Sequence, residues 1–205
     1  MNLLLVRHGQ TAFNLEQRYL GALDPPLNDT GIAQAQRLRA RLPEGIDVLI
    51  SSPLLRARQT AEILRGDSGP AVVVNDAFRE RNVGVFEGLT QREARLAFPG
   101  LWARNITRQW SAAPDEGETI AAVFARVHAG LAELLQHNAD ATVLLVAHGF
   151  VAKVIRAIAR GDHHDLFDWQ LDNAAICELQ VSPPLTSFTA EYGSNTLPQV
   201  TPNPA

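Results

Sequence analysis

The chain has 205 residues, 46% hydrophobic and 20% charged, which is ordinary for a globular protein. Its formal net charge of −4 argues against nucleic acid or an acidic membrane as a partner. A single cysteine, Cys177, excludes an intrachain disulfide, and no apolar run approaches the roughly 18 residues that span a bilayer, so we expect a cytoplasmic protein.

The first third of the chain alternates between predicted strands and predicted helices. Short apolar runs predict strands at 3–6, 47–50 and 71–74. Helical spacing of apolar residues predicts helices at 30–42 and 53–65. We expect Thr30 to cap the first helix and Pro53 to lie in the first turn of the second.

The pattern changes between 76 and 116, where a polar loop at 79–88 precedes short helical pieces at 91–98 and 101–110. We interpret this segment as an excursion, or lid, over one edge of the sheet. The remaining predictions are helices at 118–136 and 150–160 and strands at 142–147, 174–181 and 187–192.

Strands that alternate with helices predict an α/β fold, here a three-layer α/β/α sandwich with a mostly parallel central sheet. We expect one domain over 1–194 and a frayed tail, rich in Pro and Asn, over 195–205. In such folds ligands bind at the carboxyl ends of the strands.

Chemically versatile side chains follow the predicted strands. Arg7-His8-Gly9 follows the first strand, Arg56 lies in the first turn after the second, Glu80 follows the third, and His148-Gly149 follows the fourth. If the strand ends meet, one pocket holds two arginines, two histidines and a carboxylic acid.

This set of side chains suits phosphoryl transfer. The planar fork of arginine matches phosphate oxygens two at a time. A neutral histidine can act as a nucleophile, a second can donate to developing negative charge, and a glutamic acid can protonate the leaving oxygen. No metal is required, because the arginines supply positive charge. The segment 162–165, Asp-His-His-Asp, is interpreted as a solvated loop and helix start rather than a metal site.

Several motifs in order resemble those of the histidine phosphatase superfamily, also called the phosphoglycerate mutase-like family. They are Arg7-His-Gly-Gln-Thr11 with Asn14, Gly21-Ala-Leu-Asp-Pro-Pro-Leu27, Ser52-Pro-Leu-Leu-Arg56-Ala, Arg79-Glu80 with Gly84-Val-Phe-Glu87-Gly88, Glu116-Gly-Glu118-Thr119 and Ala147-His-Gly149. The resemblance implies a phosphoglycerate mutase-like fold.

The resemblance also implies roles for individual residues. His8 would be the nucleophile and become phosphohistidine, with Glu80 as the proton donor; Glu87 in the same loop is the alternative. The remaining residues expected to hold the phosphoryl group or line its pocket are Arg7, Thr11, Asn14, Gly21, Arg56, His148 and Gly149.

The implied activity is hydrolysis of a small phosphorylated metabolite, without a cofactor. The segment Gly84-Val-Phe-Glu-Gly88 is similar to that of broad-specificity and alpha-ribazole phosphatases. A cofactor-dependent phosphoglycerate mutase and a catalytically silent phospho-ligand binder are the alternatives. Arginines in 79–108 hint at polyanionic metabolites but are equally compatible with a solvated helical face. The last strands offer an edge on which two copies could pair as a homodimer.

Overall fold

The structure is a computed structural model in which residues 1–188 are described. One sheet holds five strands in the order β3-β2-β4-β1-β5. Neighbouring strands are parallel except for β5, which runs antiparallel to β1. The strands are β1 (Asn2–Arg7), β2 (Val48–Ser51), β3 (Val72–Val74), β4 (Thr142–Ala147) and β5 (Ile176–Gln180).

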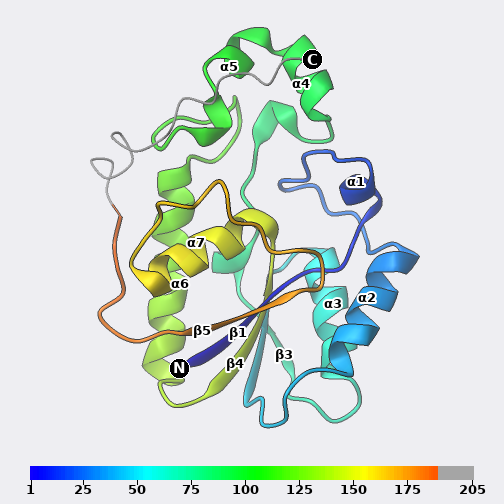
Figure 1. Ribbon diagram of the computed structural model, residues 1–205, viewed down its shortest axis with the longest axis vertical. Coiled ribbons are helices and arrows are strands. Elements are labelled where there is room, and N and C mark those ends of the chain that lie inside the picture. The colour runs from blue at the N-terminus through cyan, green and yellow to red at the C-terminus, as the bar shows by residue number, and fades with distance from the viewer. Residues whose placement is uncertain (189–205) are drawn as a thin grey trace.

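Helices cover both faces of this sheet, with α6 and α7 on one side and α2 and α3 on the other (Figure 1). The α-helices are α1 (Ala12–Leu15), α2 (Asp29–Arg39), α3 (Leu55–Arg65), α4 (Gln91–Ala97), α5 (Pro99–Ala103), α6 (Ile120–His137) and α7 (Gly149–Arg160). The short 3-10 helices are η1 (Asp76–Phe78), η2 (Gly84–Phe86) and η3 (Ile106–Arg108).

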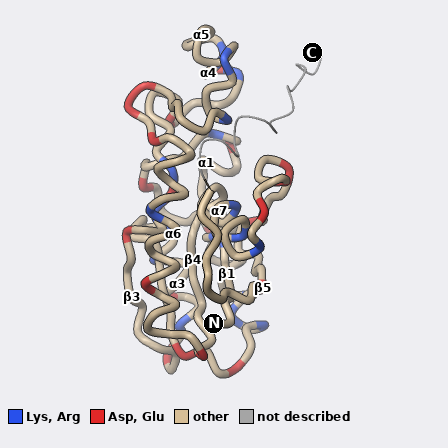
Figure 2. The backbone as a smooth tube through the Cα atoms, turned by 90° about the vertical axis from the view of Figure 1, so that its left-hand side faces the viewer, with Lys and Arg blue, Asp and Glu red and all other residues tan. Residues whose placement is uncertain are grey.

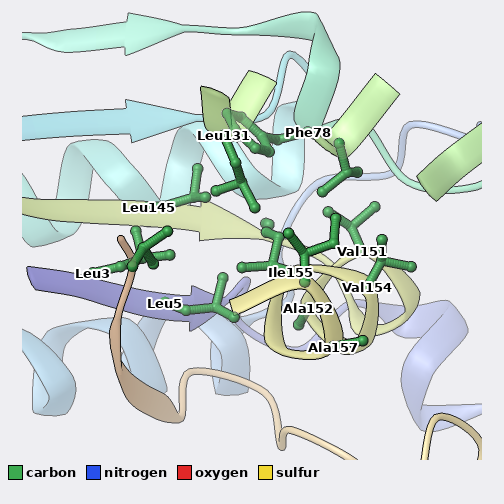
Figure 3. Packing of buried hydrophobic residues seen from close by; sticks show 14 of the residues in the cluster. Leu3, Leu5, Phe78, Leu131, Leu145, Val151, Ala152, Val154, Ile155 and Ala157 are labelled. Carbon is green, nitrogen blue, oxygen red and sulfur yellow. The ribbon is translucent and has the colours of Figure 1, made fainter. Parts of the chain in front are cut away.

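Alternation along the central strands divides their side chains between two hydrophobic clusters. In β1, Leu3 and Leu5 pack with residues of α6 and α7, among them Leu131 and Ile155 (Figure 3). Leu4 and Val6 face the opposite side, where they join α2 and α3. Both faces of a strand are thus buried, as a continuous apolar run requires. The predicted three-layer, mostly parallel fold is confirmed.

The excursion at 76–116 extends beyond the carboxyl ends of the strands, with α4 and α5 at its far end (Figure 1). It has a small hydrophobic cluster of its own, centred on Phe86, Ala94 and Ile106. Trp102 and Tyr19 pack against this cluster. The excursion therefore has an apolar centre of its own, which contacts the rest of the chain through Tyr19.

Some predicted helix boundaries were wrong. The cap of α2 is Asn28, whose side chain accepts a hydrogen bond from the N–H of Gly31, so Thr30 lies inside the helix. Helix α3 begins at Leu55, which leaves Pro53 outside its first turn.

Two further predicted helices also differ in the structure. The expected helix at 101–110 is interrupted at Asn105, whose φ of +51° is left-handed, and becomes α5 followed by η3. No helix begins at 162–165; residues 164–168 form a turn. Of the last predicted strand, Ser187 and Phe188 lie outside regular secondary structure, and its other residues fall beyond the described part of the chain, as do the tail and the domain boundary at 194.

Candidate active site

The two His-Gly pairs meet because the strands that precede them are adjacent and parallel. Arg7 at the end of β1 is in register with Ala147 at the end of β4. Each histidine is the next residue, so His8 and His148 emerge side by side, with ring centroids 5.1 Å apart. Both side chains are buried. The convergence of strand ends expected from the sequence is therefore present.

The hydrogen bonds of His8 define its tautomer. Nδ1 lies 2.7 Å from the carbonyl oxygen of Gly9, which can only accept, so Nδ1 carries the proton. Nε2 accepts a hydrogen bond from Nε–H of Arg56 at 3.2 Å. Burial, and then the positive charges of Arg56 and Arg7, hold the pKa of His8 well below its usual 6.5. His8 is thus a neutral imidazole with its lone pair on Nε2.

Arg56 is a fully buried arginine in the first turn of α3. Its Nη1 and Nη2 donate to the carbonyl oxygens of Leu23 and Gly21, at 2.6 and 3.0 Å. Gly21 has a φ of +53°, which glycine adopts without strain. Oδ1 of Asp24 lies 4.0 Å from Nη1 of Arg56. Arg56 therefore connects the 21–24 turn to the nucleophile candidate.

Arg7 borders the same space from the end of β1. Its Nη1 donates to the carbonyl oxygen of Leu171 at 2.8 Å. Its Nε is buried and has no hydrogen-bond partner within residues 1–188. Gly149 faces this guanidinium, because a Cβ on Gly149 would lie 3.6 Å from Arg7 Cζ. A fixed guanidinium with an unused donor suits an oxyanion ligand.

Glu80 is held at the start of α7. Its two carboxylate oxygens accept hydrogen bonds from the backbone N–H groups of Phe150 and Val151, at 3.2 and 3.3 Å. Arg126 holds the segment that precedes Glu80, because its guanidinium donates to the carbonyl oxygens of Ala77 and Arg79. It also donates to the carboxylate of Glu118. The carboxylate of Glu80 is thereby placed on the rim of the cavity that contains His8.

Glu87, the alternative acid, has a different position. Its Oε1 accepts hydrogen bonds from the backbone N–H groups of Ala22 and Val83, at 2.7 and 3.2 Å. It also fills the space next to Gly21, where an added Cβ would lie 2.0 Å from that oxygen. Glu87 thus connects two loops and does not line the His8 cavity.

His148 is positioned by a serine hydroxyl. Its Nε2 lies 2.6 Å from Oγ of Ser52, just beyond the end of β2. Its Nδ1 is buried without a partner among the described residues. Burial, together with the charge of Arg56, keeps the pKa of His148 well below 6.5. His148 packs behind His8 and is not among the residues that line the cavity.

Thr11 and Asn14 form one local unit. Thr11 caps α1, its hydroxyl accepts from the backbone N–H of Asn14, and Asn14 Oδ1 accepts from the backbone N–H of Thr11. Asn173 also donates to Oδ1 of Asn14, at 3.3 Å. Asn14 lines the cavity, whereas the buried hydroxyl of Thr11 does not. Thr11 therefore orients Asn14.

The cavity that joins these groups has a volume of about 290 Å³. This is close to the lower end of the range typical of small-molecule sites, ~300–1,000 Å³. Of the predicted site residues, it is lined by Arg7, His8, Asn14, Gly21, Arg56, Glu80 and Gly149.

Other residues that line the cavity were not predicted as site residues: Arg18, Tyr19, Leu20, Arg81, Val83, Thr107, Arg108, Phe150 and Phe167. Burial lowers the pKa of Arg81 to about 10. Arg81 and Arg108 belong to the arginine-rich segment 79–108, whose composition was the available signal, whereas nothing in the local pattern marked Phe167.

Within residues 1–188 no three His, Cys, Asp or Glu side chains gather in a way that could hold a metal ion. None of the helices in this part of the chain combines the length and apolar character needed to span a membrane. The charged residues that line the cavity are Arg7, Arg18, Arg56, Glu80, Arg81 and Arg108.

Comparison with known families agrees with this geometry. Residues 3–189 match the family model described as histidine phosphatase superfamily (branch 1). The match covers nearly the whole described chain, from β1 past β5.

Individual relatives are similar over most of their length. The uncharacterized phosphatase PhoE of Bacillus subtilis is 32% identical over 177 residues, 86% of each chain. The probable phosphoglycerate mutase GpmB of Yersinia pestis is 35% identical over 156 residues, 73% of this chain and 70% of the relative. The structure of a putative alpha-ribazole-5'-P phosphatase from Escherichia coli superposes with a TM-score of 0.81 at 27% identity, covering 87% of this chain and 89% of that one.

Proposed function

Because the chain belongs to the histidine phosphatase superfamily and is a phosphatase enzyme, we propose that it hydrolyses a small phosphomonoester through a phosphohistidine at His8. The observation that carries this proposal is the state of His8: a buried, neutral imidazole whose protonated Nδ1 is held by Gly9, so that the lone pair of Nε2 faces Arg56. This arrangement is that of an activated nucleophile.

In the first step, Nε2 of His8 attacks phosphorus and the P–O bond to the leaving group breaks. The Nε–H of Arg56 turns from His8 to a phosphoryl oxygen, and Arg7 Nε supplies a further donor to the equatorial oxygens. His148 Nδ1, buried against His8 without a partner among the described residues, becomes a further donor when the entering phosphoryl group displaces the His8 ring enough to expose it. Glu80 gives its proton to the leaving oxygen, which departs as an alcohol. The positive charge that develops on the imidazole is stabilised by the carbonyl oxygen of Gly9.

In the second step, water attacks the phosphohistidine. Glu80, now ionised, takes a proton from the water, the N–P bond breaks, and inorganic phosphate and neutral His8 are released. We assign the acid–base role to Glu80 because it lines the His8 cavity, whereas both contacts of Glu87 Oε1 are to loop N–H groups. Since the arginines supply positive charge, the proposed reaction requires no metal.

A mutase is the second candidate, because the GpmB relative is named a probable phosphoglycerate mutase. A mutase has to return the phosphoryl group from phosphohistidine to a retained product, whereas a phosphatase has only to admit water. Incubation with 3-phosphoglycerate and 2,3-bisphosphoglycerate separates them: a mutase forms 2-phosphoglycerate, and a phosphatase releases phosphate without isomerisation.

The proposal is tested by release of p-nitrophenol from p-nitrophenyl phosphate in the presence of EDTA. We expect turnover by the wild-type protein, unchanged by EDTA, and its loss in His8→Ala. The exposed His137 offers a matched control, because His137→Ala removes an imidazole from the end of α6. No turnover above buffer would favour a silent phospho-ligand binder, and normal turnover by folded His8→Ala would refute the nucleophile.

A further inference from the structure

One wall of the cavity carries positive charge that the proposed transfer of a phosphoryl group does not use. Arg81, Thr107 and Arg108, from the excursion, form this wall, which we call the second basic wall. Figure 2 shows that basic residues occur on the excursion as well as near the strand ends below it. The wall thus comes from a different part of the chain than His8 and Arg56.

Arg81 is held in place by hydrogen bonds, but one of its nitrogen donors has no partner among the described residues. Its Nε and Nη1 donate to the carbonyl oxygens of Glu118 and Thr107, at 2.8 and 2.6 Å. Its Cζ lies 5.2 Å from the ring centre of Phe150, which also lines the cavity. The side chain is 3% exposed, and Nη2 has no hydrogen-bond partner anywhere in residues 1–188. Buried donors are rarely left in this state without a ligand or water.

Arg108 lines the same cavity as Arg81. Its Cζ lies 5.0 Å from the ring centre of Phe167, and it forms no ion pair in the described part of the chain. Arg18, which also lines the cavity, contrasts with it because Glu16 and Glu93 lie 2.6 and 2.5 Å from its guanidinium. Within residues 1–188, therefore, no carboxylate at contact distance neutralises the positive charge of the second basic wall.

We propose that the second basic wall binds a second oxyanion of the substrate, a carboxylate or a further phosphate, while the transferred phosphoryl group lies at His8. The enzyme would then prefer phosphomonoesters that carry another negative group over matched neutral ones. This inference rests on the proposed function, because it requires the phosphoryl group at His8. The planar guanidinium of Arg81, held by two carbonyl oxygens and with Nη2 unused, suits an oxyanion.

Two matched substrate pairs test this preference. 3-Phosphoglycerate and glycerol 3-phosphate differ by a carboxylate in place of a hydroxymethyl group. Fructose 1,6-bisphosphate and fructose 6-phosphate differ by a second phosphate. We expect kcat/KM for phosphate release to be roughly ten- to hundredfold higher for the charged member of at least one pair, as charge-assisted hydrogen bonds allow. The pair that shows the preference identifies the oxyanion.

Variants then test whether the preference for the charged substrate depends on Arg81 and Arg108. Arg108→Met removes the charge and is expected to bring the ratio within each pair close to one, chiefly through KM. Arg81→Lys retains the charge but removes Nη2 and is expected to lower the same ratio. Arg95→Met is the matched control, an exposed arginine of α4 in the same excursion, and should leave the ratio unchanged.

The outcomes distinguish failure of the second basic wall from failure of the proposed phosphatase function. Equal kcat/KM within both pairs, with p-nitrophenyl phosphate hydrolysed normally, would overturn the second basic wall and leave the phosphatase intact. A preference that survives in folded Arg108→Met and Arg81→Lys would also overturn it. If no phosphomonoester is hydrolysed, the proposed function fails and the inference fails with it.

Discussion

The Nε–H of Arg56 donates a hydrogen bond to Nε2 of His8 at 3.2 Å, and the other two nitrogens of Arg56 donate to carbonyl oxygens of the 21–24 turn. A single buried guanidinium thus contacts the proposed nucleophile and fixes the turn beside it. The Nε–H of Arg56 that donates to the lone pair of His8 Nε2 can donate instead to an oxygen of an incoming phosphoryl group.

Arg56→Lys tests this arrangement. Lysine retains the charge but loses the fork, so we expect kcat/KM on p-nitrophenyl phosphate to fall about 10²–10³-fold. The carbonyl oxygens of Gly21 and Leu23 also lose donors, which should lower the free energy of unfolding by about 1–3 kcal/mol. Arg58→Lys, an exposed position on the same helix, is the control. Turnover above half of wild type in folded Arg56→Lys would contradict the assignment.

Glu80→Gln should impair poor leaving groups most. An alkoxide needs a proton as the P–O bond breaks, whereas p-nitrophenolate does not, so the loss of kcat should be roughly 10²–10⁴-fold for glycerol 3-phosphate and much smaller for the phosphorylation step with p-nitrophenyl phosphate. Single-turnover measurements compare the two.

Glu87→Gln is the control for this comparison. An amide oxygen can still accept from Ala22 and Val83, so turnover of both substrates should stay near wild type. The roles of Glu80 and Glu87 would have to be exchanged if Glu87→Gln alone showed the leaving-group dependence.

Ser52→Ala tests how His148 is positioned. Removing the hydroxyl 2.6 Å from Nε2 lets the buried imidazole rotate, so we expect a roughly tenfold lower kcat with little change in KM. Ser51→Ala is a matched control, because the Ser51 hydroxyl donates to the carbonyl oxygen of Ser52 and does not contact the histidine. Equal kcat values for the two variants would show that the contact between Ser52 and His148 has no role in turnover.

The lowered pKa values of His8 and His148 predict acid sensitivity. Below about pH 6.5 the unfolded chain binds protons at these positions while the folded protein does not, so the free energy of unfolding falls as pH decreases. Each buried imidazole should lower the free energy of unfolding at pH 5.5 relative to pH 7.5 by on the order of 1 kcal/mol. Above pH 6.5 the contribution vanishes.

Urea denaturation at the two pH values measures this effect. His8→Asn and His148→Asn should each reduce the pH-dependent loss, whereas His137→Asn, at an exposed position, should not. An unchanged pH dependence in both buried variants would mean that these imidazoles take up protons in the folded state.

The core of the site could be predicted because it depends on features that are local in sequence. Apolar runs that end in His8 and His148 indicate strands that deliver both residues to one edge of a sheet, and β1 and β4 are indeed neighbours. The position of Arg56 followed from its place in the first turn of a helix. These predictions required only periodicity and the rule for strand ends.

The second basic wall could not be predicted in this way. Arg108 reaches the cavity because Asn105 adopts a left-handed conformation and breaks the expected helix, and Arg81 is oriented by carbonyl oxygens of residues 107 and 118. Such contacts join distant segments, and periodicity does not encode them. The cap of α2 was misplaced for a different, local reason: Asn28 and Thr30 are both good capping residues.

The most direct test is to find the phosphoryl group on the enzyme during turnover. Wild-type protein mixed with a phosphomonoester and quenched in alkali within milliseconds should carry an acid-labile phosphate, located by peptide mass spectrometry at Nε2 of His8 and absent from His8→Ala. Phosphate found on another residue, or a reaction in which His8→Ala accumulates the same phosphoenzyme, would contradict the mechanism.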